Sequence, residues 1–191
     1  MNNYKYSQTW FIHSEIHQKL KSFIDKNEQN NILEIGCFEG LSSVYFADNF
    51  LDNPKSSLTC IDPFLSIDDN DHRHLLLNNE ENKFDFNISV CKNSNKIIIH
   101  KITSDMFFEN NKKLNKTYNF VYIDGCHIPD FIKRDMENSF NILEKNGIMW
   151  MDDYEGGDGI QIRNVIDEFL IKYKDKYNLI HKGYQLAIQK K

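Results

Sequence analysis

Residues 119–127 read Asn-Phe-Val-Tyr-Ile-Asp-Gly-Cys-His, a short hydrophobic run that ends in an aspartate. A second stretch, residues 147–154, has the same form and reads Gly-Ile-Met-Trp-Met-Asp-Asp-Tyr. Apolar, β-branched and aromatic runs of this length are typical of strands buried in a parallel sheet. In open α/β sheets, ligands bind at the carboxyl ends of such strands. The two stretches therefore predict a ligand site at Asp124, Asp152 and Asp153.

Strands and helices alternate along the rest of the chain. Hydrophobic runs predict further strands, and amphipathic spacing predicts helices between them. The predicted strands cover residues 31–36, 57–63, 96–101, 177–181 and 184–188, and the predicted helices cover residues 14–26, 41–50, 84–91, 130–144 and 160–173. We expect Ser14 to cap the first helix, Asn146 and Gly147 to terminate the fourth, and Lys182 and Gly183 to form a hairpin turn. This order predicts an α/β fold with a Rossmann-like, doubly wound, mostly parallel sheet and an antiparallel C-terminal hairpin.

Composition and charge exclude several classes of protein. The net charge is −5 and no block of Lys or Arg is present, so we expect no binding to nucleic acid through a basic surface. No apolar stretch is long enough to span a bilayer, and residues 1–10 lack the features of a signal peptide, so we expect a cytoplasmic protein with no membrane partner. The four cysteines show no CxxC spacing and are expected to be reduced thiols that pack in the interior.

A chain of 191 residues fits one domain. We expect residues 1–30 to form an N-terminal helical leader or cap, and residues 31–191 to form the cofactor- and substrate-binding core. Trp10 and His13 of the leader are candidates to line the substrate side, with core packing or plain surface as the alternative. Residues 68–74 are polar and match no calcium-binding loop, which favours a solvated, lid-like loop.

A turn bounded by glycines joins the first strand to its helix. Residues 34–40 read Glu-Ile-Gly-Cys-Phe-Glu-Gly, where Gly36 permits a sharp turn and close approach of a ligand. Gly40 lets the helix begin tight against the sheet, where free N–H groups can bind an anion or a carboxylate. The middle glycine of a GxGxxG motif is missing, which argues against a nicotinamide cofactor. A plain strand-to-helix turn is the alternative interpretation.

Polar residues also follow the next two strands. Asp62 stands where a carboxylate accepts hydrogen bonds from ribose hydroxyls, although a turn former ahead of Pro63 is an alternative. Ser104 and Asp105 follow the third strand and are placed for the edge of an adenine ring. A helix N-cap explains either of these two residues equally well.

Four motifs together resemble class I S-adenosylmethionine-dependent methyltransferases, and among them the catechol-type and macrocin-type small-molecule O-methyltransferases. The signatures of that branch read E-I-G-x-x-x-G, I-D-P, I-D-G-x-H and a D-D pair after a strand. This chain supplies, in the same order, Glu34-Ile35-Gly36 with Gly40, Ile61-Asp62-Pro63, Ile123-Asp124-Gly125 with His127, and Asp152-Asp153. The resemblance covers residues 31–190 and implies a seven-stranded sheet with a reversed last hairpin.

The resemblance also implies a cofactor and a site for it. S-adenosylmethionine would bind with its methionine part near Glu34 and Gly36, where Gly40 begins the helix. Asp62 would bind the ribose. The adenine would lie near Ser104 and Asp105.

Magnesium is the metal that the resemblance implies, held by Asp124, Asp152 and Asp153. Magnesium prefers oxygen ligands in octahedral geometry. The catechol type has Asp-Asn where this chain has two aspartates, so Asp153 departs from that pattern but still offers oxygen. Solvated turn carboxylates without a metal are the alternative, because many methyltransferases use the same sheet without an ion.

His127 is the candidate general base. The catechol enzymes hold a lysine at this position, and histidine side chains titrate near neutral pH, which suits removal of a proton from a metal-activated hydroxyl. As alternatives, His127 caps the helix that starts near Pro129 or supports a neighbouring ligand.

The sequence therefore predicts an S-adenosylmethionine-dependent O-methyltransferase that acts on a hydroxyl of a small molecule, such as a sugar or a vicinal diol. A metal-independent methyltransferase of the same fold, with His127 as base, is one alternative. A non-catalytic cofactor-binding or interaction module is another. The oligomeric state stays open, with a homodimer among the options.

Overall fold

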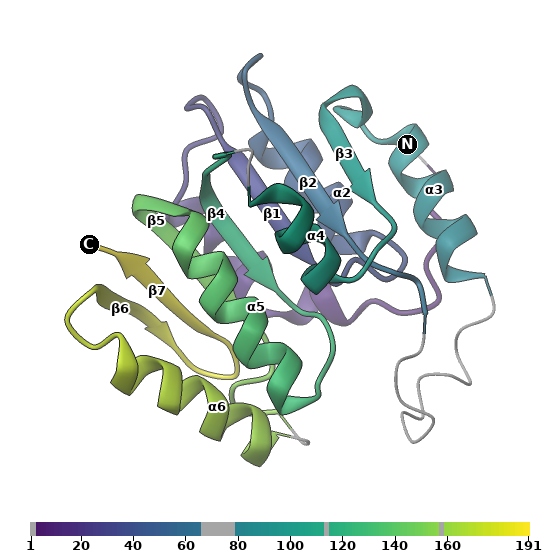
Figure 1. Ribbon diagram of the computed structural model, residues 1–191. Coiled ribbons are helices and arrows are strands. Elements are labelled where there is room, and N and C mark those ends of the chain that lie inside the picture. Colours follow the sequence, from purple (N-terminus) through teal and green to yellow (C-terminus); the bar gives the residue numbers. More distant parts are fainter. Residues whose placement is uncertain (1–2, 66–78, 113–114, 157–158) are drawn as a thin grey trace.

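The computed structural model describes residues 3–65, 79–112, 115–156 and 159–191, and within them the strands form one seven-stranded sheet (Figure 1). Their order across the sheet is β3-β2-β1-β4-β5-β7-β6. The strands are β1 (Asn31–Ile35), β2 (Ser57–Ile61), β3 (Ile97–His100), β4 (Tyr118–Ile123), β5 (Leu143–Met151), β6 (Tyr177–Lys182) and β7 (Leu186–Lys190).

Strand direction follows the sequence prediction. Neighbouring strands from β3 through β5 pair in parallel, whereas β7 pairs antiparallel with both β5 and β6. The mostly parallel, doubly wound sheet with a reversed C-terminal hairpin is therefore confirmed. The carboxyl ends of β1, β2, β4 and β5 meet at one edge of the sheet (Figure 1), and Gly36, Asp62, Asp124 and Asp152 directly follow these four strands.

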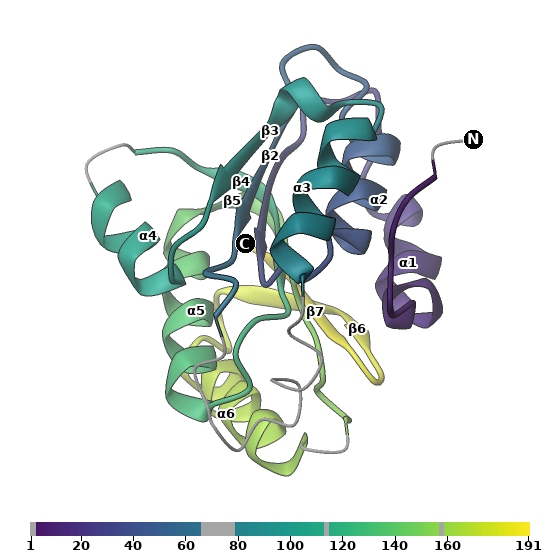
Figure 2. The same ribbon diagram turned by 90° about the vertical axis from the view of Figure 1, so that its right-hand side faces the viewer.

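Helices cover both faces of the sheet. Helices α1, α2 and α3 lie on one face, and α4, α5 and α6 lie on the other (Figure 2). The helices are η1 (Trp10–His13), α1 (Glu15–Lys19), η2 (Leu20–Ser22), α2 (Leu41–Phe50), α3 (Glu80–Val90), η4 (Ser94–Lys96), α4 (Ser104–Asn111), α5 (Pro129–Ile142) and α6 (Gly159–Lys172). The predicted lid-like run at residues 68–74 lies outside the described residues.

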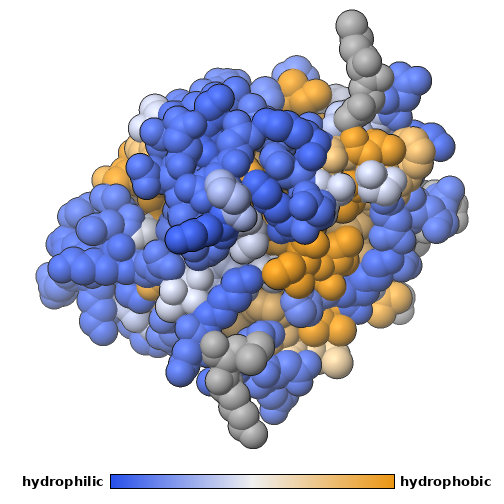
Figure 3. All heavy atoms as spheres, turned by 90° about the horizontal axis from the view of Figure 1, so that it is seen from above, coloured by the Kyte–Doolittle hydropathy of each residue, from blue (hydrophilic) through white to orange (hydrophobic). Residues whose placement is uncertain are grey.

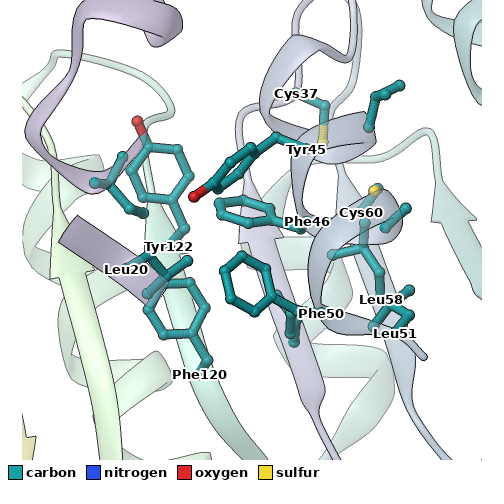
Figure 4. Packing of buried hydrophobic residues seen from close by; sticks show 14 of the residues in the cluster. Leu20, Cys37, Tyr45, Phe46, Phe50, Leu51, Leu58, Cys60, Phe120 and Tyr122 are labelled. Atoms are coloured by element: carbon teal, nitrogen blue, oxygen red, sulfur yellow. The ribbon is translucent and has the colours of Figure 1, made fainter. Parts of the chain in front are cut away.

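One hydrophobic core lies on each side of the sheet. On the first side, Tyr45, Phe46 and Phe50 of α2 point toward Phe120 and Tyr122 of β4 (Figure 4). The Phe46 ring stands edge-on to both β4 rings, with centroid distances of 5.8 and 5.7 Å. Edge-to-face aromatic pairs at such distances stabilise a core beyond their buried area. This packing fixes β4, and therefore the position of the residues that follow it.

The first helix is shorter than the predicted span of residues 14–26. Ser14 is its N-cap as expected, and its hydroxyl accepts a hydrogen bond from the His17 N–H. The helix then tightens into a 3₁₀ turn after Lys19, and Phe23 is left 37% exposed. Spacing alone does not show this, because Ile16 and Leu20 already bury the helix against the core.

The predicted terminator of the fourth helix, Asn146 with Gly147, is wrong, because both residues lie inside β5. The helix ends at Ile142 and the chain enters the sheet at Leu143. The Lys190 ammonium donates to the carbonyls of Phe140 and Leu143, at 2.7 Å each. A lysine from another strand therefore binds the carbonyls at the helix end, where a C-capping glycine would otherwise be expected.

The surface seen from above carries mostly hydrophilic side chains around a band of hydrophobic ones (Figure 3). Exposed hydrophobic side chains include Ile98 and Ile99 of the edge strand β3. Among the described residues, no helix is both long and apolar enough to cross a bilayer.

Candidate active site

Gly36 lies where the first strand turns toward α2. Its φ is +86°, and a Cβ at this position would stand 1.9 Å from the carbonyl oxygen of Asp124. The cofactor turn (residues 36–40) therefore packs directly on the backbone that leaves β4. Only glycine fits both the left-handed conformation and this close approach.

We expect Gly36→Ala to lower the free energy of unfolding by about 2–4 kcal/mol, because a left-handed alanine is strained and its methyl group meets rigid backbone. Urea denaturation measures this loss. Gly40→Ala is the matched control, since Gly40 has φ +80° but the nearest atoms to a Cβ there belong to side chains, the Phe84 ring at 3.0 Å and Ile88 at 3.6 Å. Equal losses in the two variants would contradict the backbone clash.

Asp62 holds the cofactor turn from the neighbouring strand. Its Oδ2 accepts hydrogen bonds from the N–H groups of Cys37 (2.7 Å) and Phe38 (3.0 Å). Its Oδ1 accepts from the Phe64 N–H at 2.7 Å. Asp62 is therefore a turn former, as the alternative interpretation held. It binds both the turn that follows its own strand and the turn that follows the neighbouring strand β1. The ribose-binding role stays a prediction. One carboxylate can hold the turn and also bind a ribose, because each of its oxygens has two lone pairs.

Glu34 is fully buried between β1 and α2. Its carboxyl group accepts hydrogen bonds from the hydroxyls of Ser42 and Ser43, the latter at 2.5 Å. Burial raises the pKa of Glu34 to about 7, although both serine bonds act to lower it. In the described structure Glu34 therefore fastens the start of α2. Its expected place near the methionine part of the cofactor stays a prediction.

Ser104 and Asp105 are the first two residues of α4, and neither is the helix cap. The N-cap is Thr103, whose hydroxyl accepts from the Met106 N–H, so the capping alternative is wrong by one residue. Three hydrogen bonds from the Arg134 guanidinium hold the Asp105 carboxylate. Ser104 bonds the buried carboxyl group of Asp135. Contact of either residue with adenine stays a prediction.

The N-terminal leader packs against the cofactor turn. Glu39, which is 1% exposed, accepts hydrogen bonds from the Ser7 backbone N–H and hydroxyl and pairs with Lys83 at 2.6 Å. The Trp10 ring stacks on the Phe38 ring with a centroid distance of 5.8 Å. The leader thus borders the edge of the sheet at which a cofactor would bind.

The predicted carboxylates come together at the ends of β4 and β5. The hydroxyl of Tyr122 lies 2.9 Å from Asp124 Oδ2 and 3.1 Å from Asp152 Oδ2. A hydroxyl has one hydrogen and can donate it to only one of two carboxylates at a time. The second carboxylate therefore faces oxygen lone pairs unless it carries a proton or shares a cation.

Asp153 and His127 complete the cluster. His127 Nε2 lies 2.9 Å from Asp153 Oδ2, and the Tyr184 hydroxyl donates to Asp153 Oδ1 at 2.5 Å. The expectation that His127 caps α5 is wrong, because the N-cap is Ile128 and no side chain caps the helix start. Asp153 itself has φ +56°, an uncommon conformation for a non-glycine residue that often marks a functional site.

The negatively charged side chains of this cluster lie close together, and this raises the pKa of two of them. Burial raises the pKa of Asp124 well above its usual range, and the carboxylates of Asp152 and Asp153 raise it further. Burial and Asp153 likewise raise the pKa of Asp152. Three carboxylates held so close together favour either an added proton or a bound cation.

The donor set fits a small divalent cation. A cavity of about 20 Å³, the room of one water or one small ion, is lined by all four cluster residues together with apolar side chains of β5, α5 and α6. Asp124, His127 and Asp153 each offer a donor atom within 4.8 Å of the others. Asp152 stands beside them with its oxygens held by hydrogen bonds. Because the donors are mostly carboxylate oxygens, they suit magnesium.

Some residues of the site were missed from the sequence. Tyr122 was interpreted only as part of a strand, although residues two apart on a strand share a face, which places it beside Asp124. Gln185, whose Nε2 donates to Asp152 Oδ1 at 2.7 Å, has no such local signal. Tyr184, which binds Asp153, was seen only as a strand residue.

The cysteines are free thiols, as expected. Cys37, Cys60 and Cys91 are buried and Cys126 is half-buried. Burial raises the pKa of both Cys37 and Cys60, so these thiols stay protonated beside Glu34. They act as packing groups.

Comparison with known proteins places this geometry in a family. The model of a methyltransferase domain matches residues 33–154, which is more than half of the chain and includes the cofactor turn and all four cluster residues. A search of curated proteins finds no match to this sequence.

Solved structures share the fold at low sequence identity. The O-methyltransferase TomG from Streptomyces achromogenes, in complex with S-adenosylmethionine, is 16% identical, covers 93% of this chain and 80% of its own, and has a TM-score of 0.69. The O-methyltransferase NovP is 16% identical, with coverage of 92% and 77% and a TM-score of 0.69. A protein described as an rRNA-methylase from Clostridium thermocellum is 14% identical, with coverage of 91% and 92% and a TM-score of 0.66.

Proposed function

The chain belongs to the methyltransferase-domain family and depends on S-adenosylmethionine, and we propose that it transfers the methyl group to a hydroxyl oxygen of a small molecule with magnesium beside that oxygen. The carboxylate cluster with its ion-sized cavity is the observation that carries this proposal. It lies at the sheet edge next to the cofactor turn, since Gly36 touches the backbone of Asp124.

The acceptor is proposed to be a small molecule, such as a sugar or a vicinal diol, in preference to RNA. A chain with net charge −5 does not attract a polyanion. The described structural neighbours include both kinds of enzyme, so the choice rests on charge and on the acidic site. The net negative charge of the protein repels a phosphate backbone, whereas a neutral molecule with two neighbouring hydroxyls can reach the site.

Asp124, Asp152 and Asp153 would hold the ion. When bound, magnesium would lower the pKa of the acceptor hydroxyl and fix its oxygen in place. The protein must then align this oxygen with the methyl carbon and the sulfonium sulfur, because the cofactor supplies the reactive group.

His127 is proposed to take the proton. Its Nε2 faces the Asp153 carboxylate, so the neutral ring carries its hydrogen there and leaves Nδ1 basic. When the methyl group moves from the sulfonium sulfur to the acceptor oxygen, His127 Nδ1 would accept the hydroxyl proton. The products are the methyl ether and S-adenosylhomocysteine. Asp153 would stabilise the resulting imidazolium.

A metal-independent methyltransferase of the same fold is the second candidate. The His127–Asp153 pair favours it, because a histidine oriented by a carboxylate can act as a base without an ion. The two candidates predict different effects of a chelator on the rate of methyl transfer.

We expect treatment with a chelator to lower methyl transfer by at least about tenfold, and added magnesium to restore it, because the acceptor loses its activating charge. The rate is measured as formation of S-adenosylhomocysteine from S-adenosylmethionine in the presence of each acceptor in a panel of catechols and sugars. Binding of S-adenosylhomocysteine to the chelated protein is the control and should be unchanged. A rate that is indifferent to the chelator would favour the metal-independent candidate.

A further inference from the structure

Gln185 connects the N-terminal leader to the carboxylate cluster. The residue directly precedes β7 and its side chain is fully buried. Its Oε1 accepts hydrogen bonds from the Ile16 backbone N–H at 2.7 Å and from the Trp150 indole at 3.0 Å. Its Nε2 donates to Asp152 Oδ1 at 2.7 Å. The Gln185 amide thus links helix α1 to Trp150 in β5 and to Asp152, which directly follows β5.

The three partners fix the orientation of this amide. A backbone N–H and an indole N–H can only donate, and an ionised carboxylate can only accept. A flipped amide would set N–H against N–H on one side and oxygen against oxygen on the other. The Nε2 of Gln185 must therefore face Asp152.

The backbone of Gln185 is held by the same helix. Its N–H donates to Glu15 Oε2 at 2.8 Å, and that carboxylate also binds His181 Nε2 at 2.8 Å. Helix α1 therefore determines both where Gln185 stands and which way its side chain points. No charge is added to the cluster by this contact, because the amide is neutral.

Both carboxylate oxygens of Asp152 are therefore held by hydrogen bonds. Its Oδ1 accepts from Gln185 and from the Asp153 N–H at 2.9 Å, while its Oδ2 shares the Tyr122 hydroxyl with Asp124. The Asp152 carboxylate is thus held beside Asp124 through the shared Tyr122 hydroxyl.

We propose that Gln185 is a positioning residue, which fixes the Asp152 carboxylate and through it the cation-binding geometry of the cluster. This inference rests on the proposed function, because it concerns the same cation. Partners that orient metal ligands typically contribute about 10–100-fold to metal affinity. The leader would then support the metal site through Gln185, in addition to bordering the cofactor turn.

The test is Mn²⁺ binding to the full chain by calorimetry, with Gln185→Met as the variant. Methionine has nearly the same shape but cannot donate to Asp152. We expect Mn²⁺ to bind about 10–100-fold more weakly, whereas S-adenosylhomocysteine binds within about threefold of wild type. Unchanged Mn²⁺ affinity would overturn the inference and leave the proposed function standing. If wild-type protein binds no Mn²⁺, both are overturned.

Asn30→Leu is the matched control. Asn30 is another buried amide, which donates to the carbonyls of Asp25, Glu28 and Phe50 at the opposite edge of the sheet. Its loss should destabilise the fold while leaving Mn²⁺ affinity unchanged. An equal loss of Mn²⁺ affinity in this variant would show that general destabilisation causes the effect, against the inference.

A double-mutant cycle separates positioning from packing. In an Asp152→Asn background no carboxylate remains to be fixed, so Gln185→Met should have little further effect on Mn²⁺ affinity. An equal effect in both backgrounds would contradict the inference. If Gln185→Met does not fold, Trp150→Phe replaces it, because this change removes one of the two donors that orient the amide. We expect weaker Mn²⁺ binding there too, and unchanged affinity would count against the role of Gln185.

Discussion

Replacing Asp124 by alanine should abolish methyl transfer while leaving cofactor affinity nearly intact. Asp124 follows β4, and its Oδ2 contacts the Tyr122 hydroxyl at the centre of the carboxylate cluster. Loss of a principal metal ligand removes several kcal/mol of charge stabilisation. At about 1.4 kcal/mol per tenfold change, we expect kcat/KM to fall by about a thousandfold or more.

Two measurements check this expectation. Methyl transfer to an acceptor from the hydroxyl panel gives the rate, and calorimetry with S-adenosylhomocysteine gives cofactor affinity. Asp130→Ala, which removes an exposed carboxylate from the first turn of α5, should keep nearly wild-type activity. Turnover by Asp124→Ala at the wild-type rate would refute the role of this residue.

A companion variant, Asp124→Asn, separates function from folding. It keeps the shape and can still accept the Tyr122 hydrogen, but it removes one of three crowded negative charges. The metal-free variant should therefore melt at a higher temperature than wild type, although it is inactive. This combination is typical of a site whose charges serve function at the expense of stability.

Asp62→Ala should weaken cofactor binding by about 10–100-fold. Hydrogen bonds to a charged group contribute about 1.5–3 kcal/mol, and the alanine variant loses those to the ribose hydroxyls. It also releases the N–H groups of Cys37 and Phe38, which Asp62 holds in the cofactor turn. Both effects weaken binding of S-adenosylmethionine and act in the same direction.

Calorimetry with S-adenosylhomocysteine measures this loss directly. Asp85→Ala is the control, because Asp85 is an exposed carboxylate whose partner is Lys101 on the surface. Mn²⁺ binding to Asp62→Ala should stay within about threefold of wild type, since the carboxylate cluster is not altered. Unaltered cofactor affinity in Asp62→Ala would contradict its placement at the ribose.

Much of the fold follows from local patterns in the sequence. The hydrophobic runs that end at Asp62, Asp124 and Asp152 become the parallel strands β2, β4 and β5. The helix predicted over residues 41–50 is α2 to the residue. These elements are predictable because each buries a continuous apolar run or face, whatever its neighbours are.

Boundaries set by distant residues could not be predicted in this way. The end of α5 depends on Lys190, which lies 47 residues after Leu143. Tyr154, which follows the carboxylate pair in the sequence, is fully buried and its hydroxyl donates to Asp167 at 2.9 Å. Gly157 and Asp158, which follow shortly after it in the sequence, lie outside the described residues.

The residues of the candidate site likewise fall into those that local sequence patterns predict and those that depend on distant neighbours. Asp124, Asp152 and Asp153 could be found because they follow strands whose carboxyl ends meet. Gln185 could not, because it reaches Asp152 only through the antiparallel pairing that sets Leu186 beside Met151. The bonds that Glu34 and Asp62 make in the structure also depend on their neighbours. Sequence pattern finds the charged groups, and the tertiary structure adds the groups that hold them.

The central claim is that the carboxylate cluster binds a divalent cation beside the cofactor. The most direct test is a crystal structure with S-adenosylhomocysteine and Mn²⁺, which takes oxygen ligands like magnesium and is located by its anomalous scattering. We predict one anomalous peak among Asp124, Asp152 and Asp153, within bonding distance of at least two of these carboxylates. Clear density for S-adenosylhomocysteine with no anomalous peak at the cluster would contradict the claim.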